Sequence, residues 1–203
     1  MAVRIVIAED EALIRLDLKE TLEEEGYEVV GAVGRGDEAV ELVRELHPDL
    51  AILDIKMPGL DGIAAARQIT DSRRAAVLIL TAFSQRDLVE QARDAGAFYY
   101  LVKPFQKSDL VPAIEVALGR FNDMKALEAE VEGTKELLET RRLVERAKGL
   151  LMDRAQLREN DAFSFIQRTA MQQRAKMRTV AQQIIDGTLA LEPVADPPPG
   201  KAE

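Results

Sequence analysis

The sequence predicts an α/β fold with a parallel sheet, followed by an all-helical extension. Short apolar runs rich in β-branched residues alternate with amphipathic stretches over the first 120 or so residues. Such runs suit strands that are buried on both faces of a sheet. Five strand–helix units with short connections favour three layers with right-handed crossovers. No strand pattern recurs after residue 107, so only helices are expected there.

Each expected strand is a short apolar run that ends at a glycine, a proline or a polar turn residue. We expect strands over residues 3–8, 27–33, 50–54, 77–81 and 98–102. The stretches between them repeat apolar residues every three or four positions, which is typical of a helix with one buried face. They predict helices over residues 12–25, 37–46, 61–70, 86–95 and 107–120.

The last of these helices is expected to continue as one mostly polar helix over residues 107–152. Two sets of apolar positions follow it, offset by one step, and Gly133 interrupts the second set. Residues 121–140 are therefore expected to be a helical linker, with two alternatives open: a coiled coil, or a single solvated helix. The two sets are Ile114, Ala117, Phe121 and Met124, and then Leu127, Val131, Thr134 and Leu138.

Residues 141–190 predict a small three-helix domain, of which the end of the long helix is the first member. The second helix is expected to start after Asn160, a good N-cap residue. The third carries an apolar stretch around residues 180–185 and ends at Gly187. Residues 191–203 are rich in proline and are expected to be disordered.

Charge is divided unevenly along the chain, whose net charge is −9. Residues 141–178 hold ten basic residues against four acidic ones, a net of +6, whereas residues 1–140 carry a net of −12. A basic helical unit suits nucleic acid, and the acidic part suits a different partner. The chain has no cysteine, which excludes disulfides, thiolate zinc sites and thiol nucleophiles. No signal peptide or membrane span is apparent, so a cytoplasmic location without membrane partners is expected.

Four strands of the expected sheet end in reactive polar residues. Glu9 and Asp10 follow the first, Asp54 ends the third, Thr81 ends the fourth and Lys103 follows the fifth. These groups should converge, because the carboxyl ends of parallel strands share one edge where sites form. Carboxylates bind Mg²⁺, and a carboxylate can accept a phosphoryl group as an acyl phosphate. The sequence therefore predicts phosphoryl transfer to Asp54 beside a divalent cation.

The expected roles follow from the residue types. Asp10 and Asp54 would bind Mg²⁺ or Mn²⁺ directly, and Glu9 would do so directly or through water. Lys103 would neutralise one phosphoryl oxygen, and the Thr81 hydroxyl would donate a hydrogen bond to another.

This constellation resembles the receiver domain of two-component response regulators over residues 1–120. The resemblance implies a flavodoxin-like, doubly wound (βα)5 fold with strand order 2-1-3-4-5. It also implies phosphotransfer from a sensor histidine kinase to Asp54. The residues that carry it are Glu9 with Asp10, Asp54 in Leu53-Asp54-Ile55-Lys56-Met57-Pro58-Gly59, Thr81 with Ala82, and Lys103-Pro104-Phe105.

The same resemblance implies three further features of the site. The backbone carbonyl of Lys56 joins the metal ligands, Tyr100 is the switch aromatic that responds to Thr81, and the peptide bond before Pro104 is cis. Glu9 stands where aspartate is commoner. Lys56 also flanks the site together with the bulky Phe83, which is expected to shield the acyl phosphate, so slow self-dephosphorylation is expected. No external substrate is expected.

The basic helical part resembles the ANTAR output domain, an RNA-binding module of transcription antiterminators. The resemblance implies binding to RNA hairpins with exposed loop bases. Candidate RNA contacts are Arg146, Lys148, Arg174 and Arg178, whereas Phe163 and Phe165 are expected to pack in the core. The matching residues are Arg146 to Met152, Asp161-Ala162-Phe163, Ala170-Met171, Val180-Ala181 and Ile184-Ile185.

The favoured hypothesis is a response regulator that controls antitermination by binding RNA, with a homodimer that forms on phosphorylation. A DNA-binding response regulator with a helix-turn-helix output is the alternative, because three short helices look alike in sequence. An aspartate-based phosphatase is a third class, but Lys56 stands where such enzymes need a second aspartate, two positions after Asp54.

Overall fold

The structure is a computed structural model that describes residues 2–82 and 86–189. The described residues divide into two compact units, with the boundary between Leu127 and Glu128. The strands are β1 Arg4–Ala8, β2 Glu28–Val33, β3 Leu50–Asp54, β4 Ala76–Thr81 and β5 Tyr99–Val102. The helices are α1 Ala12–Glu24, α2 Gly36–Leu46, α3 Gly62–Ser72, α4 Arg86–Asp94, α5 Lys107–Ala155, α6 Glu159–Gln173 and α7 Met177–Ile185.

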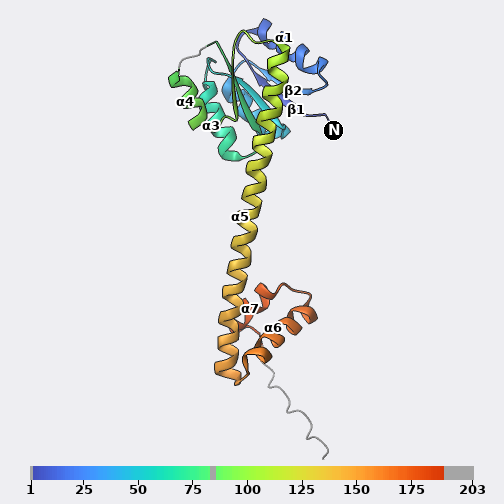
Figure 1. Ribbon diagram of the computed structural model, residues 1–203, viewed down its shortest axis with the longest axis vertical. Helices are drawn as coiled ribbons and strands as arrows, with labels where there is room; N and C mark the ends of the chain where they lie inside the picture. Colours follow the sequence, from blue (N-terminus) through green and yellow to red (C-terminus); the bar gives the residue numbers. More distant parts are fainter. Residues whose placement is uncertain (1, 83–85, 190–203) are drawn as a thin grey trace, which may run out of the picture. The chain divides into compact units, whose positions relative to one another are not determined.

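The first unit is a five-stranded parallel sheet of order β2-β1-β3-β4-β5, with helices on both faces. Figure 1 shows α3 and α4 on one side of the sheet and the start of α5 on the other. The parallel three-layer sheet is the one that the sequence pattern predicted, and its strand order is the one that the receiver resemblance implied. All five strands lie within two residues of their expected limits.

Two apolar cores hold this unit together, one on each face of the sheet. The strands alternate between them: in β3, Ala51 and Leu53 face one core, and Leu50 and Ile52 face the other. All the residues of β3 and β4 are buried. Burial on both faces explains why these strands read as continuous apolar runs. It also leaves the strand ends as the places where polar side chains can reach solvent.

The second unit contains the end of α5 together with α6 and α7, around one small core. Each helix supplies three buried residues to that core. Two of the contributions are spaced three or four residues apart along one face, as expected for packed helices. The nine residues are Val144, Ala147 and Leu151 of α5, Ala162, Ile166 and Ala170 of α6, and Val180, Ala181 and Ile184 of α7.

One expectation for this part needs correction. Helix α6 begins at Glu159, with Arg158 at the N-cap position, so Asn160 lies inside the first turn and does not cap it. Acidic Glu159 and Asp161 in that turn favour the helix N-terminus through its dipole, which explains the earlier start. Helix α5 is continuous from Lys107 to Ala155, as expected for one long helix over residues 107–152.

Among residues 2–82 and 86–189, none of the helices combines the length and the apolar character that a membrane span requires. The proline-rich segment 191–203, for which disorder is expected, lies outside the described residues.

Candidate functional site

Three carboxylates meet at the carboxyl edge of the sheet. Glu9 and Asp10 follow β1, and Asp54 ends β3, which pairs directly with β1. One oxygen from each of the three lies within 4.8 Å of the others. Glu9 and Asp54 are buried, whereas Asp10 is exposed. Clustered carboxylate oxygens are the hard donors that Mg²⁺ prefers, so these residues fit such an ion.

The Lys103 ammonium lies between two of these acids. Its Nζ is 2.5 Å from Glu9 Oε2 and 3.5 Å from Asp54 Oδ1. The other Glu9 oxygen accepts a hydrogen bond from the Glu11 backbone N–H at 3.3 Å. The Lys103–Pro104 peptide bond is cis, as the receiver resemblance implied. Lys103 therefore offsets part of the negative charge at the edge and lies beside the Asp54 carboxylate.

The surroundings of Asp54 alter its acidity. Burial raises the pKa of the Asp54 carboxyl above its usual value, the Lys103 ammonium opposes that rise, and the nearby Glu9 carboxylate adds to it. A neighbouring anion and a low-dielectric site both disfavour the charged form. A bound cation would reverse this balance, because it stabilises the carboxylates together.

Thr81 and Tyr100 lie on neighbouring strands. Thr81 is fully buried at the end of β4, and Tyr100, on β5, packs against the core that α3 and α4 cover. Burial raises the pKa of the Tyr100 phenol, and a hydrogen bond with Thr81 opposes that rise. The two side chains that the sequence analysis linked as a switch pair are therefore in contact.

The loop from β3 to α3 follows Asp54 and carries Lys56. Asp61 caps α3 by accepting a hydrogen bond from the Ala64 backbone N–H at 2.8 Å. Gly62 then passes so close to β3 that an added Cβ would lie 1.9 Å from the Asp54 carbonyl oxygen. Sequence reasoning missed both residues, although an aspartate before a helical stretch is a known N-cap signal. Together they fix where the chain leaves Asp54.

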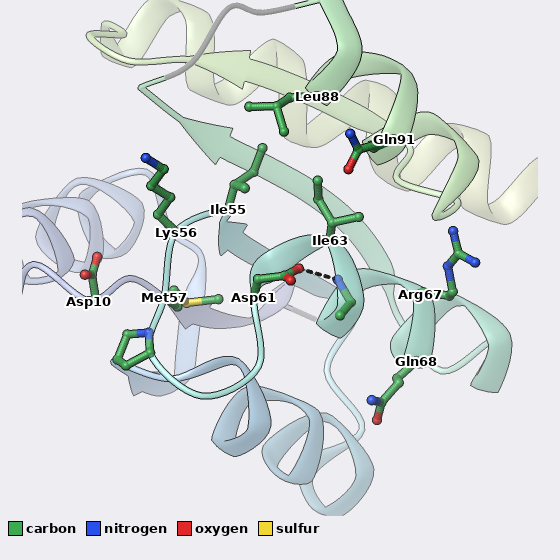
Figure 2. Close-up of a pocket in the computed structure, with 12 residues that line it drawn as sticks. Asp10, Ile55, Lys56, Met57, Asp61, Ile63, Arg67, Gln68, Leu88 and Gln91 are labelled. Atoms are coloured by element: carbon green, nitrogen blue, oxygen red, sulfur yellow. Dashed lines mark hydrogen bonds between the residues drawn. The ribbon is translucent and has the colours of Figure 1, made fainter.

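Two depressions adjoin the acidic edge. One is lined by Asp10, Asp54, Lys56 and Lys103, and gives access to the acids. The other is a groove of about 930 Å³ between the β3–α3 loop, α3 and α4. Figure 2 shows Ile55, Ile63 and Leu88 along this groove, with Lys56 and Asp10 at one end and Arg67 at the other. Phe83, which the sequence analysis placed beside the site, lies outside the described residues.

The four RNA-contact candidates of the second unit differ in their surroundings. The Lys148 ammonium lies 3.0 Å from Glu145 and 2.8 Å from Glu159, and its side chain is only 9% exposed. Arg178 pairs with Glu139 at 2.9 Å. Arg146 and Arg174 are exposed and have no carboxylate partner within residues 2–82 and 86–189. These two arginines thus keep their charge available to a ligand.

The two phenylalanines of α6 differ in how far they are exposed. Phe165 packs against the three-helix core, whereas Phe163 is 42% exposed. The expectation that both pack in the core is therefore wrong for Phe163. They lie two residues apart on one helix, which points them in different directions, and α5 and α7 cover only one of those directions.

The fold and the acidic edge define the class of protein. The family model for the response regulator receiver domain matches residues 5–115, and that for the ANTAR domain matches residues 132–185. The chain belongs to the response regulators of two-component signalling, with an RNA-binding ANTAR domain as its output.

The chain is 61% identical to the transcriptional regulatory protein PdtaR of Mycobacterium tuberculosis over 184 residues. This alignment covers 90% of this chain and 89% of that protein. The first unit also resembles the chemotaxis protein CheY of Thermotoga maritima, at 40% identity over 56% of this chain and 96% of that protein. A two-component response regulator of the LuxR family from Aurantimonas sp. SI85-9A1 has a similar structure, with TM-score 0.55 and 32% identity over 59% of this chain and 86% of that chain.

Proposed function

We propose that a sensor histidine kinase phosphorylates Asp54 and that this controls binding of hairpin RNA, and hence transcription antitermination, by the ANTAR domain. The observation that carries the proposal is the Asp54 carboxylate, 3.5 Å from the Lys103 ammonium and grouped with two further acids. In this proposal residues 1–120 receive the signal, residues 121–140 are the linker and residues 141–190 bind RNA.

The reaction at the site is a displacement at phosphorus. An Asp54 carboxylate oxygen attacks the phosphohistidine of the kinase, a P–O bond forms, the P–N bond breaks, and the histidine imidazole leaves. Lys103 stabilises one phosphoryl oxygen and the Thr81 hydroxyl donates to another. Asp10, Asp54 and the Lys56 carbonyl would hold Mg²⁺, with Glu9 bound directly or through water. When bound, the ion supplies positive charge that screens the acids from the phosphoryl oxygens.

The phosphoryl group acts on the rest of the unit through Thr81. When Thr81 moves to the phosphoryl oxygen, it gives up its hydrogen bond with Tyr100, whose ring then takes a new position. This changes the surface formed by β5 and the start of α5.

A second copy of the chain is the proposed partner of α5. Leu127, Val131 and Leu138 repeat at heptad spacing, and they are 62%, 50% and 51% exposed. A stripe of this kind suits a coiled coil. We therefore propose that phosphorylation favours a homodimer through residues 121–140.

The phosphorylated form is proposed to hydrolyse slowly, with Phe83 shielding the acyl phosphate from water and Lys56 lining the depression at the acids. Protein phosphorylated with a small phosphodonor and then freed of it should keep the label for many minutes. Loss within seconds, without any added phosphatase, would contradict this.

The test of the proposed function compares wild-type protein with Asp54→Asn, each treated with acetyl phosphate and Mg²⁺. Phosphorylation of the wild type should increase its mass in size-exclusion chromatography and its affinity for hairpin RNA, and the variant should show neither change. Equal behaviour of the two proteins would overturn the switch. Competition by duplex DNA is measured in the same gel shifts, since a preference for duplex DNA would favour a DNA-binding output.

A further inference from the structure

Helix α6 carries a row of exposed side chains beside the face that forms the core. Phe163, Gln167 and Met171 recur at intervals of four residues, which aligns them along one side of the helix, and Arg174 follows the last turn. Ser164 and Arg168 flank them. The chain as a whole has 36 acidic residues against 27 basic ones. Glu159, one turn before Phe163, is paired with Lys148, so Arg168 and Arg174 give the rest of this row a positive charge.

This row of side chains does not contribute to the core of the second unit. The residues of α6 that form the core are Ala162, Ile166 and Ala170, on the adjoining side of the helix. Phe163 and Met171 are 42% and 69% exposed. Large apolar side chains exposed together in this way mark an interaction site more often than a single one does.

The side chains of the row suit the bases of an unpaired RNA segment. A phenylalanine ring can stack on a base, and the amide of Gln167 can both donate to and accept from a base edge. Arg168 and Arg174 can contact phosphates, and in the part of the chain that the structure describes neither has a carboxylate partner. The mixture of an aromatic ring, an amide and guanidinium groups favours nucleic acid over an apolar protein surface.

Lys148, a candidate RNA contact of this unit, already forms ion pairs with two carboxylates of the protein. Lys148 lies against Glu145 and Glu159, with its side chain 9% exposed, and so it joins α5 to the first turn of α6. Releasing its ammonium to an RNA phosphate would leave two carboxylates near that phosphate. The charge that meets RNA must come from residues without such partners.

We propose that the α6 face formed by Phe163, Gln167, Met171 and Arg174 binds the unpaired loop bases of hairpin RNA, with Phe163 stacking on a base, Arg174 on a phosphate, and Lys148 positioning α6. This assignment rests on the proposed function, since it locates the RNA-binding site of the same output domain.

The first experiment changes Phe163 in the full-length protein and measures binding to RNA hairpins that share one stem and carry randomised loops, one loop base being 2-aminopurine. Phe163→Ala and Phe163→Leu should weaken binding about tenfold or more, the scale of one lost base stack. Phe163→Tyr should retain both the affinity and the fluorescence change caused by stacking. Leu13→Ala is the matched control, because Leu13 is 83% exposed on α1, outside the segments proposed to bind RNA or to dimerise, and should not affect binding.

The second experiment removes the charge of Arg174 without disturbing the helix end. Arg174 follows α6 in the left-handed region, at φ 50°, where glycine is favoured. Arg174→Gly should therefore fold at least as stably as the wild type, yet reduce the dependence of log affinity on log salt by about 1. Gln156→Gly is the control, since Gln156 has φ 56° in the same unit but carries no charge.

The outcomes separate the two proposals. If the wild-type protein binds no hairpin RNA, the proposed function and this assignment both fall. If the wild type binds and Phe163→Ala or Phe163→Leu binds equally well, only the assignment falls. If Phe163→Ala instead lowers the mass of the protein in sedimentation while RNA affinity is unchanged, the face is an interface between two copies, which also overturns the assignment.

Discussion

At the scale of single residues, the site depends on how two of its three acids, Glu9 and Asp54, share one lysine. Lys103 lies closer to Glu9, at 2.5 Å, than to Asp54, at 3.5 Å. The Asp54 carboxylate is thus only partly neutralised, and burial together with Glu9 raises its pKa. The charged Asp54 carboxylate therefore destabilises the folded protein. Binding of a cation, alone or together with a phosphoryl group, would relieve this cost. The raised pKa is therefore compatible with a site that gains stability on binding Mg²⁺.

The first prediction concerns the stability of Asp54→Asn. The folded protein holds the proton of the Asp54 carboxyl more tightly than the unfolded chain does. The free energy of unfolding of the wild type therefore falls as pH rises from 3.8, the usual pKa of an aspartate, through the raised pKa of Asp54. Asp54→Asn lacks this loss, so its thermal midpoint should exceed that of the wild type by several degrees at neutral pH without Mg²⁺.

Thermal unfolding followed by circular dichroism over a pH series checks this prediction. The difference between the two proteins should shrink as pH falls towards 3.8, where the Asp54 carboxyl becomes protonated in both states. A difference that grows on acidification would contradict the raised pKa. Asp123→Asn, at an exposed position of α5 away from the acids, is the control and should leave the midpoint nearly unchanged.

At the scale of elements, the site is built by close approach of α3 to β3. Gly62 has no room for a side chain, because its Cβ would lie 1.9 Å from the carbonyl oxygen of Asp54. Its backbone N–H also donates to the Ile55 carbonyl oxygen at 2.9 Å. The start of α3 therefore sets the position of the residue that accepts the phosphoryl group.

The second prediction is that Gly62→Ala destabilises the protein by about 1–3 kcal/mol, as overpacking against fixed atoms does. It should also slow the phosphorylation of Asp54 by acetyl phosphate. The matched control is Gly133→Ala on α5, where an added Cβ meets nothing within 4 Å. This control should stabilise the protein by about 0.5–1 kcal/mol in denaturant unfolding. Equal effects of the two substitutions would show that the contact with β3 is unimportant.

An ion pair between Lys148 and Glu159 links α5 to α6. The third prediction concerns the stability that this ion pair provides. Hydrogen bonds to Glu159 and Glu145 raise the pKa of the Lys148 ammonium, and the one from Lys148 lowers the pKa of Glu159. Lys148→Met should lower the thermal midpoint of the second unit at neutral pH. The deficit should fade as pH falls through the lowered pKa of Glu159, since that group stabilises the fold only when charged.

The matched control for Lys148→Met is Lys135→Met. Lys135 lies 4.0 Å from Glu132 with both side chains largely exposed, so its loss should have little effect on unfolding. Equal midpoints for the two variants in scanning calorimetry would indicate that Lys148 does not hold the helices together.

At the scale of the whole molecule, the two units have separate cores, since the core residues on the two faces of the sheet precede residue 125 and those of the second unit follow residue 142. The fourth prediction is that Mg²⁺ stabilises only one of them. In scanning calorimetry, Mg²⁺ at about 100 times its dissociation constant should stabilise the first unit by about 2.7 kcal/mol and leave the second transition unmoved. An equal shift of both transitions, or a shift in Asp54→Asn protein as large as in wild type, would contradict it.

Much of the fold was predictable from the sequence, because the buried strands and the amphipathic helices differ in their apolar period. The strand ends were equally informative: Glu9, Asp54 and Lys103 could be assigned to one edge once a parallel sheet was expected. The start of α6 was misplaced, because a capping preference at Asn160 is weaker than the favourable placement of Glu159 and Asp161 in the first turn.

The sequence by itself determined the class of protein, the sheet, the acidic edge and the basic output domain, because these depend on local period, composition and residue type. Only the tertiary structure decided which partners those residues take. It pairs Glu9 with Lys103 and Lys148 with Glu159, and it leaves Phe163 exposed while it packs Phe165. Such choices depend on residues that are distant in the chain and on which side of a helix its neighbours cover, and a one-dimensional pattern holds neither.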